Sequence, residues 1–235
     1  MGIDSAPNVA KVFDQQAEVF DQFSRGSFHW RHMEKPALDR HLAPLLRPDT
    51  RAFDVGCGGG RMAEYLVEHG VPQENITGID VSKNLLARAK EKMPGADFKE
   101  GDASKLEIDK RFDLAVSHMV FEFLDTRQLR ATLQNIHRHL NPGGILFYVT
   151  VHPNKDPKER RDRTWTDTSA PWGGDIPVYR RPLEDLIEET KSAGFEIDTV
   201  LDLRFLDSAR EEDEMQYKKY EKYGPMRLLV KAHRV

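Results

Sequence analysis

The spacing of hydrophobic positions changes near residue 50. Between Val9 and Leu46 the apolar residues recur at roughly helical spacing, at Val12, Phe13, Val19, Phe20, Phe23, Met33, Leu38, Leu42 and Leu45. This spacing predicts two helices, with a break between Ser24 and Ser27 where Gly26 interrupts the pattern.

Beyond residue 50, short apolar runs alternate with amphipathic stretches. The runs predict strands over 52–55, 76–80, 97–100, 112–117 and 145–151, and the amphipathic stretches predict helices over 61–70, 83–93 and 126–140. A helix over 183–193 and strands over 195–205 and 226–233 follow, and the charged run 209–220 between those two strands is expected to be a solvated helix face. Such alternation is typical of βα units around a parallel sheet.

We expect one domain over residues 1–235. Its parts are N-terminal helices (1–46), a cofactor-binding core (51–151), a substrate-side insert (152–182), and a C-terminal helix with strands (183–235). The insert is rich in Pro, Trp, Arg, Asp and Gly and has no sustained period, so it is predicted to be a long connection, and such connections are often functional.

Composition narrows the class of protein. With 39% hydrophobic and 31% charged residues, the chain has the make-up of a globular protein. The formal charge of -4 provides no broad positive field, which disfavours nucleic acid and a membrane surface as partners. One cysteine cannot form an internal disulfide, and the first residues lack the apolar stretch of a secretory signal, so a cytoplasmic location is predicted.

A glycine-rich segment follows the first predicted strand. Asp54 precedes Gly56, Gly58 and Gly60, which have the spacing G-x-G-x-G. The nicotinamide fingerprint G-x-G-x-x-G would need glycine at position 61, where Arg61 stands, and no Gly-Lys-Ser/Thr follows as in a phosphate-binding loop. The segment therefore favours a cofactor without a pyrophosphate.

These residues resemble the first motif of class I S-adenosylmethionine-dependent methyltransferases. Further motifs follow in the family's order, namely Ile79-Asp80-Val81-Ser82, Glu100-Gly101-Asp102-Ala103, FDLAVSHMVFEFL and HLNPGGILFYV. The resemblance implies an α/β, doubly wound, Rossmann-like fold with a seven-stranded sheet in the order 3-2-1-4-5-7-6. The last strand is expected to be antiparallel, and the N-terminal helices are expected to form a lid.

The resemblance also implies roles for individual residues. Asp54 and the loop glycines would bind the amino-acid end of S-adenosylmethionine, Asp80 the ribose hydroxyls, and Asp102 the adenine. The neighbouring positions Cys57, Val81, Ala103 and Ser117 are placed at the cofactor with them. Asp80 and Asp102 can also be read as turn or capping residues, because Asp often follows a strand.

Three further residues are candidates for catalysis because strand ends in such a sheet face the ligand crevice. His118, His152 and Glu122 follow predicted strands and are candidates for a general base, although methyl transfer needs one only if the acceptor must lose a proton. They can equally be polar residues at a strand exit. No metal is expected, because no histidine spacing matches a metal site, and His137 and His139 are expected to face solvent.

Within the insert, Trp165, Trp172, Tyr179 and Arg180 are candidates for substrate binding. The tryptophans can also simply pin the insert to the core. A slight basic excess in the insert favours an anionic acceptor. The aromatic residues of the N-terminal helices can close the site as a lid or pack in the core.

The predicted function is methyl transfer from S-adenosylmethionine to a small molecule by in-line displacement. A methyltransferase acting on nucleic acid or protein, a nicotinamide-dependent oxidoreductase, and a cofactor-binding regulator without turnover remain alternatives. Fold alone does not fix the acceptor, and the oligomeric state stays open.

Overall fold

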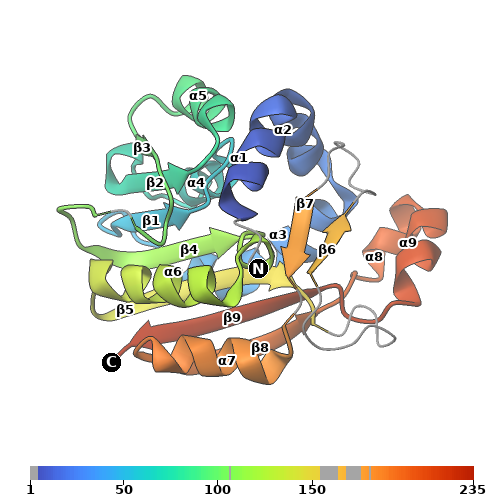
Figure 1. Cartoon of the computed structure of the whole chain (residues 1–235). Coiled ribbons are helices and arrows are strands. Elements are labelled where there is room, and N and C mark those ends of the chain that lie inside the picture. Colours follow the sequence, from blue (N-terminus) through green and yellow to red (C-terminus); the bar gives the residue numbers. More distant parts are fainter. Residues whose placement is uncertain (1–4, 106, 154–163, 168–175, 180) are drawn as a thin grey trace.

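The computed structural model describes residues 5–105, 107–153, 164–167, 176–179 and 181–235. Seven strands form one sheet in the order β3-β2-β1-β4-β5-β9-β8 (Figure 1). They are β1 (Ala52–Val55), β2 (Ile76–Asp80), β3 (Asp97–Glu100), β4 (Phe112–His118), β5 (Leu140–Val151), β8 (Phe195–Leu203) and β9 (Arg227–Arg234). Since β6 and β7 lie outside this sheet, its order is the expected 3-2-1-4-5-7-6, which confirms the predicted fold class.

The first five strands of the sheet are parallel, and β9 is antiparallel to both β5 and β8. The predicted antiparallel last strand is therefore confirmed. Because parallel neighbours end at the same edge, β1, β2 and β4 bring Val55, Asp80 and His118 to one edge of the sheet.

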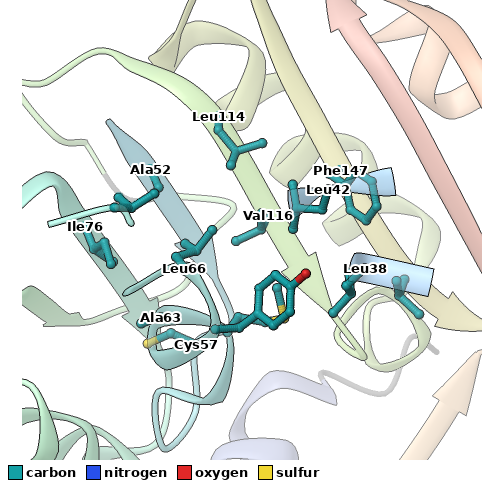
Figure 2. Packing of buried hydrophobic residues seen from close by; sticks show 14 of the residues in the cluster. Leu38, Leu42, Ala52, Cys57, Ala63, Leu66, Ile76, Leu114, Val116 and Phe147 are labelled. Carbon is teal, nitrogen blue, oxygen red and sulfur yellow. The ribbon is translucent and has the colours of Figure 1, made fainter. Parts of the chain in front are cut away.

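Two layers of helices cover the sheet. Alternate side chains of the strands pack against α3 (Lys35–His41) and α4 (Arg61–Glu68) on one face, and against α6 (Thr126–His139) and α7 (Leu183–Ser192) on the other. Figure 2 shows part of the first layer, whose labelled residues are Leu38, Leu42, Ala52, Cys57, Ala63, Leu66, Ile76, Leu114, Val116 and Phe147. Burial of both faces explains why the central strands β1 and β4 read as nearly continuous apolar runs.

The segment before β1 contains more breaks than the two predicted helices. It forms α1 (Ser5–Gln15), α2 (Ala17–Gly26), a π-helical turn (Trp30–Glu34), α3 and a 3-10 turn (Ala43–Leu45). The break after Gly26 is where the sequence predicts it, but α1 and α2 separate at Gln16, without a glycine or proline to mark the change. Both helices lie beside α5 (Lys83–Lys92), at the edge where β1, β2 and β4 end (Figure 1).

Two other predicted boundaries differ. Strand β5 begins at Leu140 rather than at 145, because Leu140 pairs with Phe112 before a register shift. In the insert, β6 (Thr164–Asp167) and β7 (Ile176–Tyr179) form an antiparallel pair that the sequence pattern does not reveal.

Short elements complete the described chain. They are the 3-10 turns Gln73–Asn75 and Phe121–Phe123 and the exposed helices α8 (Ser208–Glu212) and α9 (Glu214–Glu221), which occupy the predicted charged run. Among the described residues, no helix combines the length and apolar character that crossing a membrane requires.

Candidate active site

The glycine-rich turn joins β1 to α4 and forms the centre of the site. Gly56, Gly58 and Gly60 have φ of 74°, 51° and 85°, a region that other residues rarely adopt. A Cβ on Gly56 would lie 2.3 Å from Cγ2 of Val120. The backbone N–H groups of Gly56 and Cys57 donate to the carbonyl oxygen of Ile79, at 2.8 and 2.9 Å, which fixes the turn against β2.

A cavity opens beside this turn. It lies between the ends of β1, β2 and β4 and the inner side of α1 and α2. Its apolar wall includes Val9, Phe13, Phe20, Met62, Ile79, Leu85, Met119, Val120, Phe123 and Leu124. Its polar lining includes Asp21, Ser24, Arg61, Asp80, Asp102, His118 and Gln128.

Most of the cofactor residues expected from the sequence meet in this cavity. Its lining includes Gly56, Cys57, Gly58, Asp80, Val81, Asp102 and Ala103. Gly60 and Ser117 are next to lining residues in the chain, and Asp54 is two residues before the lining residue Gly56, but these three do not line the cavity themselves. The N-terminal helices contribute Phe13 and Phe20, whereas Phe28 and Trp30 are buried outside the lining.

Asp80 presents its carboxylate at the end of β2. Its Oδ2 accepts from the N–H of Gly58 and its Oδ1 from the N–H of Ser82, both at 2.8 Å. Burial raises the pKa of this carboxyl, against the backbone hydrogen bonds that lower it. Each oxygen can accept one further hydrogen bond, so the group can still bind hydroxyls.

Asp102 follows β3 and also lines the cavity. Its Oδ1 accepts from the N–H and the hydroxyl of Ser104, at 2.9 and 2.7 Å, and Oδ2 lies 3.2 Å from Nζ of Lys105. Burial acts to raise the pKa of Asp102, but these contacts outweigh it and hold the pKa below its usual value. Asp102 is therefore an ionised hydrogen-bond acceptor. Ala103, the next residue in the chain, also lines the cavity.

Asp54 is buried beneath the turn. Among the described residues, its Oδ2 has no hydrogen-bond partner, and burial, with the charge of Asp80, raises its pKa to about 7. A buried carboxyl with an unsatisfied oxygen is costly without a partner. It fits a site that is completed by a ligand with a positive charge or a hydrogen-bond donor.

His118 lines the cavity at the end of β4. Its Nδ1 lies 2.7 Å from Nη2 of Arg61, and because a guanidinium only donates, Nδ1 is the acceptor. Burial and the charge of Arg61 lower the pKa of His118 to about 3, so the ring is neutral near pH 7. Its one proton then sits on Nε2, which lies 3.4 Å from Oε2 of Glu34.

The other two catalytic candidates lie outside the cavity lining. Nε2 of His152 lies 3.0 Å from Oδ1 of Asp202 in β8. Glu122 is buried, accepts from the Thr150 hydroxyl at 2.9 Å, and lines a separate small cavity. Burial raises the pKa of Glu122 to about 7, and its Oε1 has no hydrogen-bond partner in the part of the chain that the structure describes.

The substrate-side candidates are only partly described. Tyr179 ends β7 and lines the small cavity with Glu122 and Arg181. The backbone of Trp165 pairs with Val178 in the β6–β7 pair. Trp172 and Arg180 lie outside the described residues.

Arg61 is one of the lining residues that the sequence analysis missed, because it was considered there only as the residue that breaks the nicotinamide fingerprint. Its position directly after the last loop glycine is a signal that could have found it. No group of three His, Cys, Asp or Glu side chains in the described ranges is placed to hold a metal ion. His139 is also buried, its Nε2 lying 3.1 Å from the backbone nitrogen of Ile108, so the expectation that it faces solvent is wrong.

The strand order, the glycine turn and the acid at the end of β2 together define a Rossmann-like methyltransferase fold. Residues 52–144 match the family model described as a methyltransferase domain. Residues 52–144 therefore carry a methyltransferase domain, and the strand order is the one that the resemblance to class I S-adenosylmethionine-dependent methyltransferases implies.

Individual relatives agree with this family. The chain is 32% identical over 48% of its length to "Uncharacterized methyltransferase sll0829" of Synechocystis sp., covering 54% of that protein. It is 31% identical over 54% of its length to "Trans-aconitate 2-methyltransferase" of Methylobacterium nodulans, covering 48% of it. The chain thus spans about half the length of these curated relatives.

A solved structure matches over more of the chain. The S-adenosylmethionine dependent methyltransferase of Mesorhizobium loti superposes with a TM-score of 0.69 at 24% identity, covering 89% of this chain and 99% of that one. At this level of identity the match supports the fold.

Proposed function

We propose that the protein transfers a methyl group from S-adenosylmethionine to a small-molecule acceptor. The observation that carries the proposal is the cavity itself, in which the glycine turn and Asp80 meet at the ends of β1 and β2. The methyltransferase family match over residues 52–144 supports the same reaction.

The residues of the cavity fit the parts of this cofactor. Gly56 and Gly58 line the cavity, and Asp54, two residues before Gly56, has a buried oxygen that no described residue satisfies. Asp80 would hold the ribose hydroxyls, and Asp102 with Ala103 the adenine. The acceptor would enter where His118, Met119 and Phe123 face α1 and α2.

When bound, S-adenosylmethionine supplies a methyl group made electrophilic by its sulfonium. The protein's contribution is to align the acceptor in line with that methyl and to exclude water with the apolar wall, because proximity and orientation are the main needs of such a displacement. His118 is poorly placed as a base, since Nδ1 already accepts from Arg61. We therefore propose that His118 positions Arg61 and that the acceptor reacts without losing a proton to His118.

An acceptor that is already anionic suits this site. A carboxylate or another ionised oxygen offers a lone pair with no proton to remove, and the curated relative from Methylobacterium is named for an acid. The formal charge of -4 argues against a nucleic-acid substrate, and Arg61 at the position of the third fingerprint glycine argues against hydride transfer to a nicotinamide.

Calorimetry with S-adenosylhomocysteine tests the proposal. The wild type should bind, and Asp80→Asn should bind at least about tenfold more weakly, because a hydrogen bond to a charged group contributes roughly 1.5–3 kcal/mol. Asp185→Ala, an exposed acid at the start of α7, serves as the control and should bind like the wild type. No binding at high micromolar ligand, or undiminished binding by Asp80→Asn, would overturn the assignment.

A thermal-shift comparison separates the oxidoreductase alternative. S-adenosylmethionine should raise the melting temperature and NADH should not, because binding to the native state alone stabilises it. A shift with NADH only would favour the alternative.

A further inference from the structure

One end of the cavity carries a fixed positive charge. Arg61 begins α4, and its Nη1 donates to the carbonyl oxygen of Ser24 at 2.6 Å. Nη2 donates to Nδ1 of His118 at 2.7 Å, and the guanidinium carbon lies 4.4 Å from the ring centroid of Trp30. These three partners are a carbonyl, a neutral imidazole and an aromatic face, so none of them carries a negative charge.

The acid in this cluster is already committed to another residue. Oε1 of Glu34 accepts from Nε of Arg227 at 2.8 Å, and its Oε2 lies 3.4 Å from Nε2 of His118. Within the described part of the chain, no carboxylate is ion-paired with Arg61. Arg61, Arg227 and Glu34 therefore sum to one positive charge. Asp54 offsets this charge only in part, because its pKa of about 7 leaves it partly protonated near neutral pH.

A second cluster beside the same end has the same sign. Asp21 of α2 lies 2.9 Å from Nε of Arg25, 3.0 Å from Nε of Arg88 and 2.5 Å from Nζ of Lys92. Arg25 also pairs with Glu64. Three cations and two carboxylates again leave one positive charge.

The part of the cavity at the ends of β2 and β3 has the opposite sign, because Asp80 and Asp102 line it. A buried cation without a counter-ion is unfavourable, and an arginine fork matches a carboxylate with two parallel hydrogen bonds. The charge distribution thus suits a ligand that places an anionic group beside α2 and its hydroxyls beside β2.

We propose that Arg61, held in place by Ser24, Trp30 and His118, binds a carboxylate in this cavity. The inference rests on the proposed function, because it assigns the charged end of that same site. Two carboxylates can meet this arginine, namely the one on the amino-acid part of the cofactor and one on the acceptor.

Calorimetry with two cofactor products tests the first source. S-adenosylhomocysteine carries the carboxylate, and 5′-methylthioadenosine lacks the whole amino-acid part. If Arg61 binds the cofactor carboxylate, Arg61→Gln should weaken the binding of S-adenosylhomocysteine at least about tenfold. The affinity for 5′-methylthioadenosine should stay within about twofold of the wild-type value. Arg61→Lys keeps the charge without the fork and should recover part of the loss.

The second source is tested on protein saturated with S-adenosylhomocysteine, with citrate as the probe. If the acceptor supplies the carboxylate, Arg61→Gln should retain the affinity for S-adenosylhomocysteine and lose citrate binding. Arg47→Gln, an exposed arginine paired with Asp49, should match the wild type in both titrations.

The remaining outcomes contradict the inference. If Arg61→Gln lost the same factor in affinity for both nucleosides, the role of Arg61 would be structural. If the affinities for S-adenosylhomocysteine and citrate were both unchanged, Arg61 would have no ligand. If the wild type bound neither nucleoside, the proposed function would itself fail, which is a different result. Circular dichroism of each variant checks that it is folded.

Discussion

Gly56 and Gly143 have almost the same backbone conformation, with φ of 74° and 73°, but different surroundings. A Cβ on Gly143 would meet nothing within 4 Å, whereas one on Gly56 would overlap Val120. The pair therefore separates the cost of a left-handed backbone from the cost of a clash.

Replacing each of the two glycines by alanine should show this difference. Gly143→Ala should lower the free energy of unfolding by about 1–2 kcal/mol, the cost of the left-handed conformation. Gly56→Ala should cost roughly 1–3 kcal/mol more because the added methyl is overpacked. Urea denaturation of both variants measures the difference, and equal losses would show that Val120 moves away freely.

Glu122 predicts a pH dependence of stability. Burial raises its pKa in the folded state to about 7, above the unfolded value, so its contribution to stability is fully present below about pH 4.5 and is lost as the pH rises through about 7. Glu122→Gln keeps an oxygen that can accept from Thr150 but cannot ionise. The free energy of unfolding of the variant minus that of the wild type should therefore increase by roughly 3 kcal/mol between pH 5 and pH 8.

Denaturant unfolding of the two proteins at both pH values provides this measurement. Asp54 and His118 titrate in both proteins, so their effects cancel in the comparison. A difference between variant and wild type that did not change with pH would mean that Glu122 ionises normally.

At the residue level, the sequence predicts best what depends on local spacing. Asp80 is the last residue of a strand, and Gly56 and Asp102 follow a strand within two residues. The structure brings all three to one cavity. The partners of Arg61 and Glu34 were not predictable in this way. Arg227 is 193 residues from Glu34, and no local pattern marks such a contact.

Among the elements, α1 and α2 cover the cavity and are attached through two carboxylates. Asp14 of α1 accepts from the hydroxyl of Ser82 at 2.6 Å and from the N–H of Asn84 at 3.1 Å. Asp21 of α2 binds the cations of α2 and α5 described above, and a Cβ on Gly59 would lie 2.3 Å from its Oδ1. The covering helix is thus held to the turn and to α5 by charge.

Removing the charge of Asp21 should loosen this cover. In Asp21→Asn the cations lose their counter-ion, so S-adenosylhomocysteine should dissociate about tenfold faster, equivalent to about 1.4 kcal/mol. Added salt should speed dissociation from the wild type more than from the variant, because salt screens the ion pairs.

Surface plasmon resonance at low and high salt measures these rates. Glu214→Gln removes an exposed carboxylate that pairs with Arg210 and Lys218 in α8 and α9, and it should behave as the wild type. If Asp21→Asn kept the wild-type dissociation rate, α2 would not gate the ligand.

Element prediction was accurate where hydrophobic periodicity is strong. All seven strands of the main sheet and helices α4 to α7 were expected near their observed positions. The β6–β7 pair was missed because its strands lie in the insert, where Pro, Trp, Arg, Asp and Gly interrupt any sustained period. The burial of His139 was missed because its partner Ile108 belongs to a different segment of the chain.

For the whole molecule, the net charge predicts that the protein does not bind nucleic acid. The formal charge of -4 does not favour binding to a phosphate backbone. Filter binding with a transfer RNA should show no retention at low salt. Retention that falls linearly with the logarithm of salt concentration would instead support a nucleic-acid substrate.

The single-domain division, the cytoplasmic location and the small-molecule acceptor stay predictions. Each depends on properties that a strand order does not specify, since one fold serves many substrates.

The placement of β9 has a consequence for synthesis on the ribosome. This strand lies between β5 and β8, although it follows β8 in the chain. Until residues 227–234 have emerged, β5 has an unpaired edge and β8 has no neighbour to join. Arg227 begins the same strand, so the growing chain reaches its ligand-binding shape only after nearly all of these residues have been translated.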